Sequence, residues 1–325
     1  MEPTPDPVLV ERRGSTGVLI LNRPQTLNAL DADMVARLSE VLEQWRDDDA
    51  IERVELRGAG ERAFCAGGDV VAIWRDARAG GTASTEYWRA EYTLDAAIAR
   101  YPKPVVSVMH GLTLGGGIGL GAHASTRVVT QSSRLGMPEV SIGFVPDVGG
   151  TWLLSRAPGE LGTHLALTGG TVGPGDAIAL GLADVYVPLD RLHPLEPAPP
   201  PQPELLPQRD WIDEAYAGDD VGAILARLEA GPGAAAAETI RSKSPTAVAV
   251  TLASLRRARE LPSLEAALRQ EYRVAVHALT WPDLQEGIRA QLIDKDRSPR
   301  WAPLDEHAVA TAFDPVDPEL ELEQP

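Results

Sequence analysis

The chain has 325 residues, 44% of them hydrophobic, so it can bury a substantial core in one large domain or two smaller ones. Its formal charge of −17 at pH 7 argues against nucleic acid as a partner, because backbone phosphates would be repelled. The single cysteine, Cys65, excludes an internal disulfide and a cysteine-based metal cluster, and no run of about eighteen apolar residues is present to cross a membrane.

The first sixty residues predict two strands, a helix and a third strand. Val8–Val10 and Gly17–Asn22 read as a strand pair joined by a turn at residues 13–16. Asp31 can cap a helix whose apolar side chains recur at helical spacing, namely Met34, Leu38, Val41, Leu42 and Trp45. Residues 54–57 return to strand and lead into a glycine-rich loop.

Helix and strand alternate again over the next sixty residues. Residues 86–100 predict a helix that ends before Lys103-Pro104, and residues 105–109 predict a strand. The glycine cluster at 115–119 then opens another helix. Strand, strand and helix in repeated order predict an α/β protein of the kind that stacks as a spiral.

Composition divides the later part of the chain. Residues 193–208 contain seven prolines, which is typical of an extended, semi-rigid segment. Residues 210–301 follow a helical pattern, and the last twelve residues carry repeated acids and prolines. We therefore expect four parts: an α/β core over 1–190, a proline-rich linker over 191–209, a helical C-terminal region over 210–313 and an acidic disordered tail over 314–325.

The N-terminal segment suggests where the protein works. Residues 1–6 are acidic and proline-rich, with neither an apolar signal core nor an arginine-rich transit pattern. Lysine occurs only at positions 103, 243 and 295, a bias typical of a GC-rich bacterial gene. We expect a cytoplasmic protein.

Residues 136–150 carry the most informative chemistry. They place two carboxylates, Glu139 and Asp147, in a turn-rich segment that is otherwise nearly uncharged. A carboxylate that loses its solvation can serve as a base, acid or nucleophile near neutral pH. Two glycine loops upstream, at 66–69 and 115–119, can present backbone N–H groups to a ligand. This combination predicts that two amides polarise a carbonyl oxygen while a carboxylate attacks it or activates water.

These motifs, in this order, resemble the crotonase (enoyl-CoA hydratase/isomerase) superfamily. The resemblance rests on Phe64–Asp69, Gly115–Gly119, and Met137–Glu139 running on to Gly149-Gly150. Further motifs are similar to its 3-hydroxyisobutyryl-CoA hydrolase branch: Pro146–Gly150, Arg89–Tyr92, Glu286–Ala290 and Leu292–Asp296. The match extends from about residue 8 to 301, and it implies a crotonase-like spiral of ββα units followed by a helical C-terminal region.

The resemblance also implies roles for single residues. The two oxyanion-hole amides map onto Ala66 and Gly116, and Glu139 takes the catalytic position, with Asp147 as a second catalytic or substrate-orienting acid. The substrate-binding set is Glu91, Gly67, Gly68 and Gly115, and Arg23 and Lys295 are expected near the phosphates of coenzyme A. No metal or redox cofactor is implied, because coenzyme A arrives and leaves as part of the substrate.

Each assignment has a structural alternative. Asp147 could be an ordinary turn residue, since Pro-Asp before Gly-Gly favours turns, and Glu91 could lie on a solvated helix face. The glycines could serve only tight turns. We interpret Cys65 as a packed, unreactive thiol rather than a nucleophile. His110 and His123 have no partners at metal-ligand spacing, so we expect no metal site.

Gly119 separates two reactions of the superfamily. Hydratases carry a glutamate at this position, which works with a second glutamate to add water across a double bond. Here position 119 has no side chain, and the second acid is Asp147, where hydratases have glycine. The expected activity is therefore hydrolysis of an acyl-CoA thioester, which in that branch belongs to valine breakdown.

Two other classes stay open: enoyl-CoA hydration or isomerisation, and a catalytically idle acyl-CoA-binding protein. Glu139 could either attack the thioester to give a mixed anhydride or activate water directly. Acyl-CoA is the only partner expected, with neither nucleic acid nor membrane. A homo-oligomer is open, because members of the family that the chain resembles often form trimers, but the helical region could cover the same surface within one chain.

Overall fold

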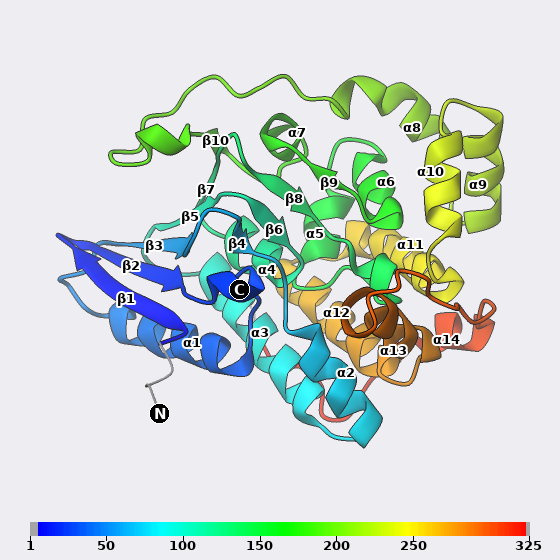
Figure 1. The fold of residues 1–325 in the computed structure, drawn as a ribbon, viewed down its shortest axis with the longest axis horizontal. Coiled ribbons are helices and arrows are strands. Elements are labelled where there is room, and N and C mark those ends of the chain that lie inside the picture. Colours follow the sequence, from blue (N-terminus) through cyan, green and yellow to red (C-terminus); the bar gives the residue numbers. More distant parts are fainter. Residues whose placement is uncertain (1–5, 323–325) are drawn as a thin grey trace. The chain divides into compact units, whose positions relative to one another are not determined.

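A computed structural model of the chain describes residues 6–322 (Figure 1). These residues form two compact units. The first unit takes the chain up to Asp69, then Ala90–Leu135 and Val172–Pro203. The second takes Val70–Arg89, Gly136–Thr171 and the chain from Glu204 onward. The units interleave along the sequence: the predicted core over 1–190 is divided between them, and their last boundary, between Pro203 and Glu204, falls inside the predicted linker over 191–209.

The first unit is built on a six-stranded sheet with the order β1-β2-β3-β5-β7-β10. Only β1 is antiparallel to its neighbour, and the other pairs are parallel. The strands are β1 Val8–Arg13, β2 Thr16–Leu21, β3 Arg53–Gly58, β5 Val105–Met109, β7 Thr126–Val129 and β10 Val185–Tyr186. The side chains of β5 are all buried, as expected for a parallel strand covered on both faces.

Helix α1 (Ala32–Arg46) confirms the predicted cap and apolar face. The Asp31 carboxylate accepts a hydrogen bond from the Met34 amide at 2.9 Å, which satisfies a free donor at the helix start. The buried face, which packs on β1 and β2, consists of Met34, Val35, Leu38, Val41 and Leu42. Glycine is required at position 17 in β2, because any Cβ there would overlap the Trp45 ring.

A second, four-stranded sheet has the order β4-β6-β8-β9. Its strands are β4 Ala63–Cys65, β6 Leu112–Leu114, β8 Arg134–Gly136 and β9 Thr171–Val172. Each of the first two strands ends at a glycine loop, and the helix α4 (Gly116–Ala122) follows β6 after one residue. The remaining short elements of this unit are η1 Pro24–Thr26, α7 Pro174–Ala179 and η3 Leu189–Arg191. Helix α3 (Ala83–Ala99) begins in the second unit and ends in the first.

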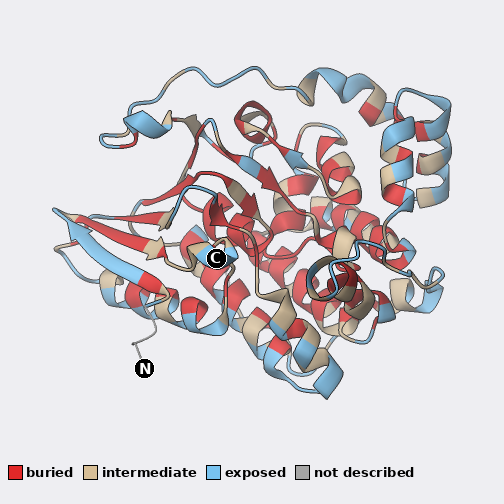
Figure 2. Cartoon of the chain, in the orientation of Figure 1, coloured by how far each residue is buried: buried red, intermediate tan, exposed pale blue. Residues whose placement is uncertain are grey.

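The second unit is helical, as the pattern after residue 210 predicted. Its helices are α2 Val70–Ala79, α5 Gly150–Ser155, α6 Leu161–Thr168, α8 Arg209–Ala215, α9 Val221–Ala230, α10 Ala234–Arg241, α11 Pro245–Glu260, α12 Leu264–Ala278, α13 Pro282–Ile288 and α14 Glu306–Thr311. Short turns of helix are η2 Glu139–Ile142, η4 Leu206–Gln208 and the π-helix η5 Arg289–Ile293. Ser244 and Ser263 cap α11 and α12, and Figure 2 shows α9 and α10 with one buried and one exposed face.

The proline-rich segment has no helix or strand between Arg191 and Leu206, but η4 and the first residue of α8 lie inside the predicted linker over 191–209. The predicted disorder of the tail is wrong for residues 314–322. Leu320 is 2% exposed, Glu319 pairs with Arg273 at 2.9 Å, and Arg269 donates to the Leu322 carbonyl. Arginines of α12 thus offset the acids of the tail. Residues 323–325 of the predicted tail, and the first five of the N-terminal segment, lie outside the described residues.

Candidate active site

The two predicted glycine loops adjoin each other in the first unit. The Leu30 amide donates to the Gly67 carbonyl at 2.8 Å, and the Asp69 amide donates to the Leu30 carbonyl at 2.7 Å. Gly67 has a φ of +106°, a conformation that side chains rarely allow. A Cβ built on Gly116 would lie 3.4 Å from the Gly68 nitrogen, so these two backbones approach closely.

The structure corrects one of the two predicted oxyanion donors. The Ala66 amide donates to the Leu27 carbonyl at 3.0 Å, so it is already engaged by the main chain. Within residues 6–322 we find no hydrogen-bond acceptor for the amides of Gly68 and Gly116. The available pair is therefore Gly68 and Gly116. The sequence could not show this, because which amide of the loop is engaged depends on the neighbouring segment.

Glu91 lies against the second glycine loop. Its side chain is buried, and its Oε1 would be 2.5 Å from a Cβ built on Gly116. The alternative of a solvated helix face is therefore wrong. Burial, together with the negative charges of Glu91 and Asp95, raises the pKa of the Cys65 thiol to about 12. Cys65 is the packed, neutral thiol that we predicted.

Arg23 is engaged in holding this region together. Its guanidinium pairs with Asp31 at 2.9 Å and with Asp69 at 3.7 Å, and it donates to the Ala29 carbonyl. Two carboxylates thus lie beside its charge, and its predicted contact with coenzyme A phosphates stays a prediction. Lys295 is exposed, with a φ of +57°, and its predicted role stays a prediction.

Glu139 belongs to the second unit, where it opens η2 directly after Pro138. It is 7% exposed, and its carbonyl accepts from the Phe144 amide at 3.1 Å. Gly143 ends η2 with a φ of +71°, and a Cβ at this position would overlap the Asp283 backbone of α13. The backbone of the turn that carries Glu139 is thereby packed against α13.

Asp147 precedes a strained turn. It is 5% exposed, and its carbonyl accepts from the Gly150 amide at 2.6 Å. Val148 and Gly149 both have positive φ, +51° and +77°. For a β-branched valine such a conformation costs on the order of 1–3 kcal/mol, and strain of this kind concentrates at functional sites. The turn anticipated in the alternative interpretation exists, but its strain favours a functional role.

A third carboxylate, Glu271 of α12, secures this turn and was missed in the sequence. Its carboxylate accepts hydrogen bonds from the Gly149 amide at 2.6 Å and the Thr151 amide at 2.9 Å, and also from the Thr151 hydroxyl. Burial, with a smaller contribution from the Asp147 charge, raises the pKa of Glu271 to about 8. The signal was present in the sequence, because position 271 lies on the apolar face of the helix formed by residues 264–278.

Gly119 and His110, which also belong to the first unit, bear on the missing hydratase acid and on the metal question. Gly119 is buried inside α4, so its position carries no carboxylate. A ring nitrogen of His110 lies 2.9 Å from the Gly60 carbonyl, which gives this histidine a structural partner. Over residues 6–322, no three His, Cys, Asp or Glu side chains are grouped to hold a metal ion. The same range contains no helix long and apolar enough to span a bilayer.

Comparison with known proteins gives one family. The family model described as enoyl-CoA hydratase/isomerase matches residues 16–198 and 195–313. The chain is 36% identical to the mitochondrial 3-hydroxyisobutyryl-CoA hydrolase of Danio rerio, over 94% of this chain and 87% of that protein. It is 34% identical to 3-hydroxyisobutyryl-CoA hydrolase 1 of Arabidopsis thaliana, over 98% and 94% of the two chains.

Solved structures agree on the fold. A carnitinyl-CoA dehydratase from Mycobacterium thermoresistibile superposes with a TM-score of 0.94 at 48% identity, covering 97% of this chain and 98% of that one. An enoyl-CoA hydratase from Rhodobacter sphaeroides gives a TM-score of 0.93 at 42% identity, with 97% and 100% covered. The predicted α/β fold with a helical C-terminal region is confirmed.

Proposed function

The chain belongs to the enoyl-CoA hydratase/isomerase family, and we propose that within it the protein is an acyl-CoA thioester hydrolase acting on 3-hydroxyisobutyryl-CoA. Relatives named as that hydrolase align with more than nine tenths of the chain. The observation that carries the proposal is the arrangement of acids. Position 119 is a buried glycine, whereas Asp147 is a buried acid beside a strained turn.

In this proposal the amides of Gly68 and Gly116 bind the thioester oxygen. As the carbonyl carbon becomes tetrahedral, negative charge develops on that oxygen, and fixed N–H donors stabilise it without reorganising. Gly116 starts α4, so the partial positive charge of the helix end adds to the effect. Loss of one such donor commonly costs about 3 kcal/mol of transition-state stabilisation.

The carboxylates supply the nucleophile and the proton transfers. Glu139 either removes a proton from water as water attacks the carbonyl carbon, or attacks that carbon itself to form an anhydride that water opens. In both routes the C–S bond breaks, and coenzyme A leaves as a thiolate that takes up a proton. We assign Asp147 to orienting the substrate hydroxyl or delivering that proton. Glu271 keeps the Asp147 turn in place.

Enoyl-CoA hydration is the second candidate, because the two structural neighbours above are named as a dehydratase and a hydratase. Hydration needs one group to place water and another to deliver a proton. The glycine at position 119 removes the usual second acid, which favours hydrolysis.

The deciding experiment incubates the purified protein separately with 3-hydroxyisobutyryl-CoA and with crotonyl-CoA. Release of free thiol from the first substrate, without loss of the crotonyl double bond in the second, supports the hydrolase. Loss of the double bond without thiol release supports the hydratase. Binding of both substrates without turnover supports an acyl-CoA-binding protein.

We further propose a cytoplasmic location and the absence of a metal or redox cofactor. The animal relatives are named as mitochondrial, whereas the compared structures come from bacteria. Cell fractionation tests the location, and unchanged thiol release after dialysis against a chelator tests the cofactor. Sedimentation of the purified chain distinguishes a monomer from a homo-oligomer.

A further inference from the structure

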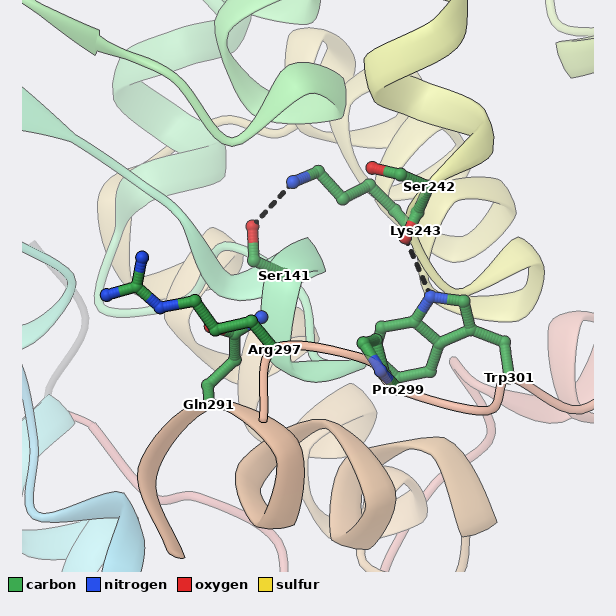
Figure 3. A pocket seen from close by; sticks show the side chains of 7 residues that line it. All are labelled: Ser141, Ser242, Lys243, Gln291, Arg297, Pro299 and Trp301. Carbon is green, nitrogen blue, oxygen red and sulfur yellow. Dashed lines mark hydrogen bonds between the residues drawn. The ribbon is translucent and has the colours of Figure 1, made fainter. Parts of the chain in front are cut away.

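The second unit contains a basic hollow of about 380 Å³ that is separate from the residues assigned to the reaction (Figure 3). Its lining consists of Ser141, Ser242, Lys243, Gln291, Arg297, Pro299 and Trp301. Neither Glu139 nor Asp147 nor Lys295 is among them. Two of the seven lining side chains are cationic and none is acidic, although the whole chain has a formal charge of −17.

Lys243 is half-buried and has a neutral partner. Its amine donates to the Ser141 hydroxyl oxygen at 2.9 Å, and Figure 3 shows the side chain directed at that oxygen. Because the hydroxyl oxygen accepts from Lys243, its own hydrogen is left to donate to a ligand. Burial disfavours the charged form of the Lys243 amine and so lowers its pKa from its usual value. A bound anion would favour that charged form.

The carboxylates that precede Arg297 in the sequence pair with another arginine. Asp294 and Asp296, which both precede Arg297 in the sequence, pair with Arg289 at 2.6 and 2.7 Å. The Arg297 amide donates to the Ala290 carbonyl at 3.0 Å, and this residue has a φ of +54°. Among residues 6–322 no carboxylate pairs with Arg297 or Lys243. Both positive charges are therefore available to a ligand.

One wall of the hollow is apolar and fixed. The Trp301 indole nitrogen donates to the Ser242 carbonyl at 2.8 Å, which holds the ring in place, and Pro299 lies in the same wall. A hollow of this volume falls in the size range of small-molecule sites and exceeds the need of a single inorganic ion. An indole face also provides a surface on which a planar ring can stack.

We propose that this hollow binds the phosphate group of a small organic molecule, with Lys243, Arg297 and the Ser141 hydroxyl as its donors and Trp301 as the contact for its ring. Guanidinium and ammonium groups together with a hydroxyl are the donors that phosphate recognition commonly uses. The source of the phosphate is either a free mononucleotide or the nucleotide end of a coenzyme A molecule. The site does not depend on which reaction the enzyme performs.

Titration calorimetry with three probes tests this assignment: inorganic phosphate, AMP and adenosine 3′,5′-bisphosphate. We expect the nucleotides to bind at least tenfold more tightly than inorganic phosphate, and binding to weaken as salt is added. The bisphosphate binding more tightly than AMP supports the coenzyme A source, and the reverse order supports a free nucleotide. Equal affinity for all three probes would overturn the assignment to an organic phosphate.

The variants Lys243→Met and Arg297→Gln should each weaken nucleotide binding at least tenfold. Arg300→Gln is the matched control, since it removes the same charge from the same segment at a residue that does not line the hollow, and it should stay within twofold of wild type. Arg297 is exposed, so its variant remains informative if Lys243→Met does not fold. No binding at millimolar concentration, or equal binding by wild type and both variants, contradicts the proposal.

Discussion

The carboxylate of Glu91 occupies the space next to Gly116 where any larger residue would place its Cβ. The two atoms would be 2.5 Å apart, and the same Cβ would lie 3.1 Å from Leu30 Cδ1. The glycine at this position is therefore needed for the approach of a buried acid to a free amide, and not only for the turn. Gly116 and Glu91 both belong to the first unit, where they lie side by side.

Gly116→Ala should lower kcat/KM for thioester hydrolysis by about a hundredfold, because the new methyl group displaces either the Glu91 carboxylate or the amide that binds the oxyanion. Steady-state thiol release measures the effect. Gly222→Ala, on the exposed side of α9, is the control and should keep wild-type activity. Wild-type kinetics in Gly116→Ala would remove Gly116 from the oxyanion hole.

Asp147→Gly restores the residue that hydratases carry, and it should reduce hydrolysis sharply while acyl-CoA still binds. The donors of Gly68 and Gly116 are untouched by this change, so the KM for the substrate should move less than kcat. Kinetics and calorimetry with a non-hydrolysable thioether analogue separate the two parameters. Full activity with only a lower melting temperature would make Asp147 the ordinary turn residue.

Glu271 should make the stability of the protein depend on pH. Its pKa is about 8 in the folded chain against 4.5 for the free side chain, so folding favours the protonated form. This contribution is fully present below about pH 4.5 and is lost as the pH rises through about 8. The free energy of unfolding should therefore fall across this interval in the wild type, and less steeply in Glu271→Gln.

Urea unfolding at several pH values between 5 and 9 provides the comparison. The exposed Glu238→Gln should keep the wild-type slope, because its carboxyl group lies in solvent in both states. Parallel curves for wild type and Glu271→Gln would show that Glu271 does not titrate in this interval.

The Cys65 thiol should resist modification in the native protein. It is fully buried and its pKa is about 12, so the reactive thiolate is scarce at pH 8. A chromogenic disulfide reagent should label it only after denaturation, and Cys65→Ala should retain hydrolase activity. Rapid labelling of the native chain, with loss of activity, would restore the nucleophile interpretation.

Features set by local pattern could be read from the sequence, and features set by distant segments could not. The cap at Asp31, the strand at 105–109 and the helix after the second glycine loop follow from neighbouring residues, and the structure confirms them. The amide of Ala66 is occupied by Leu27, almost forty residues away along the chain. No spacing within the loop reveals such a contact.

The acidic residues show the same difference between features set by neighbouring residues and features set by distant segments. Glu139 and Asp147 were found because they interrupt an apolar segment, and both are buried. Glu271 lies more than 120 residues beyond Asp147, so its contact with the turn depends on how α12 packs against α5. The tail was misjudged for a related reason: its acids and prolines suggest disorder, but arginines elsewhere in the second unit bind it.

The most direct test of the proposed reaction is the release of free thiol from 3-hydroxyisobutyryl-CoA by wild type and by Glu139→Gln. The amide has nearly the volume of the carboxylate but can act neither as a base nor as a nucleophile. We predict turnover by the wild type and a loss of at least a hundredfold in kcat for the variant, with an unchanged circular dichroism spectrum. Near-wild-type thiol release by Glu139→Gln, or none by the wild type, would contradict the account.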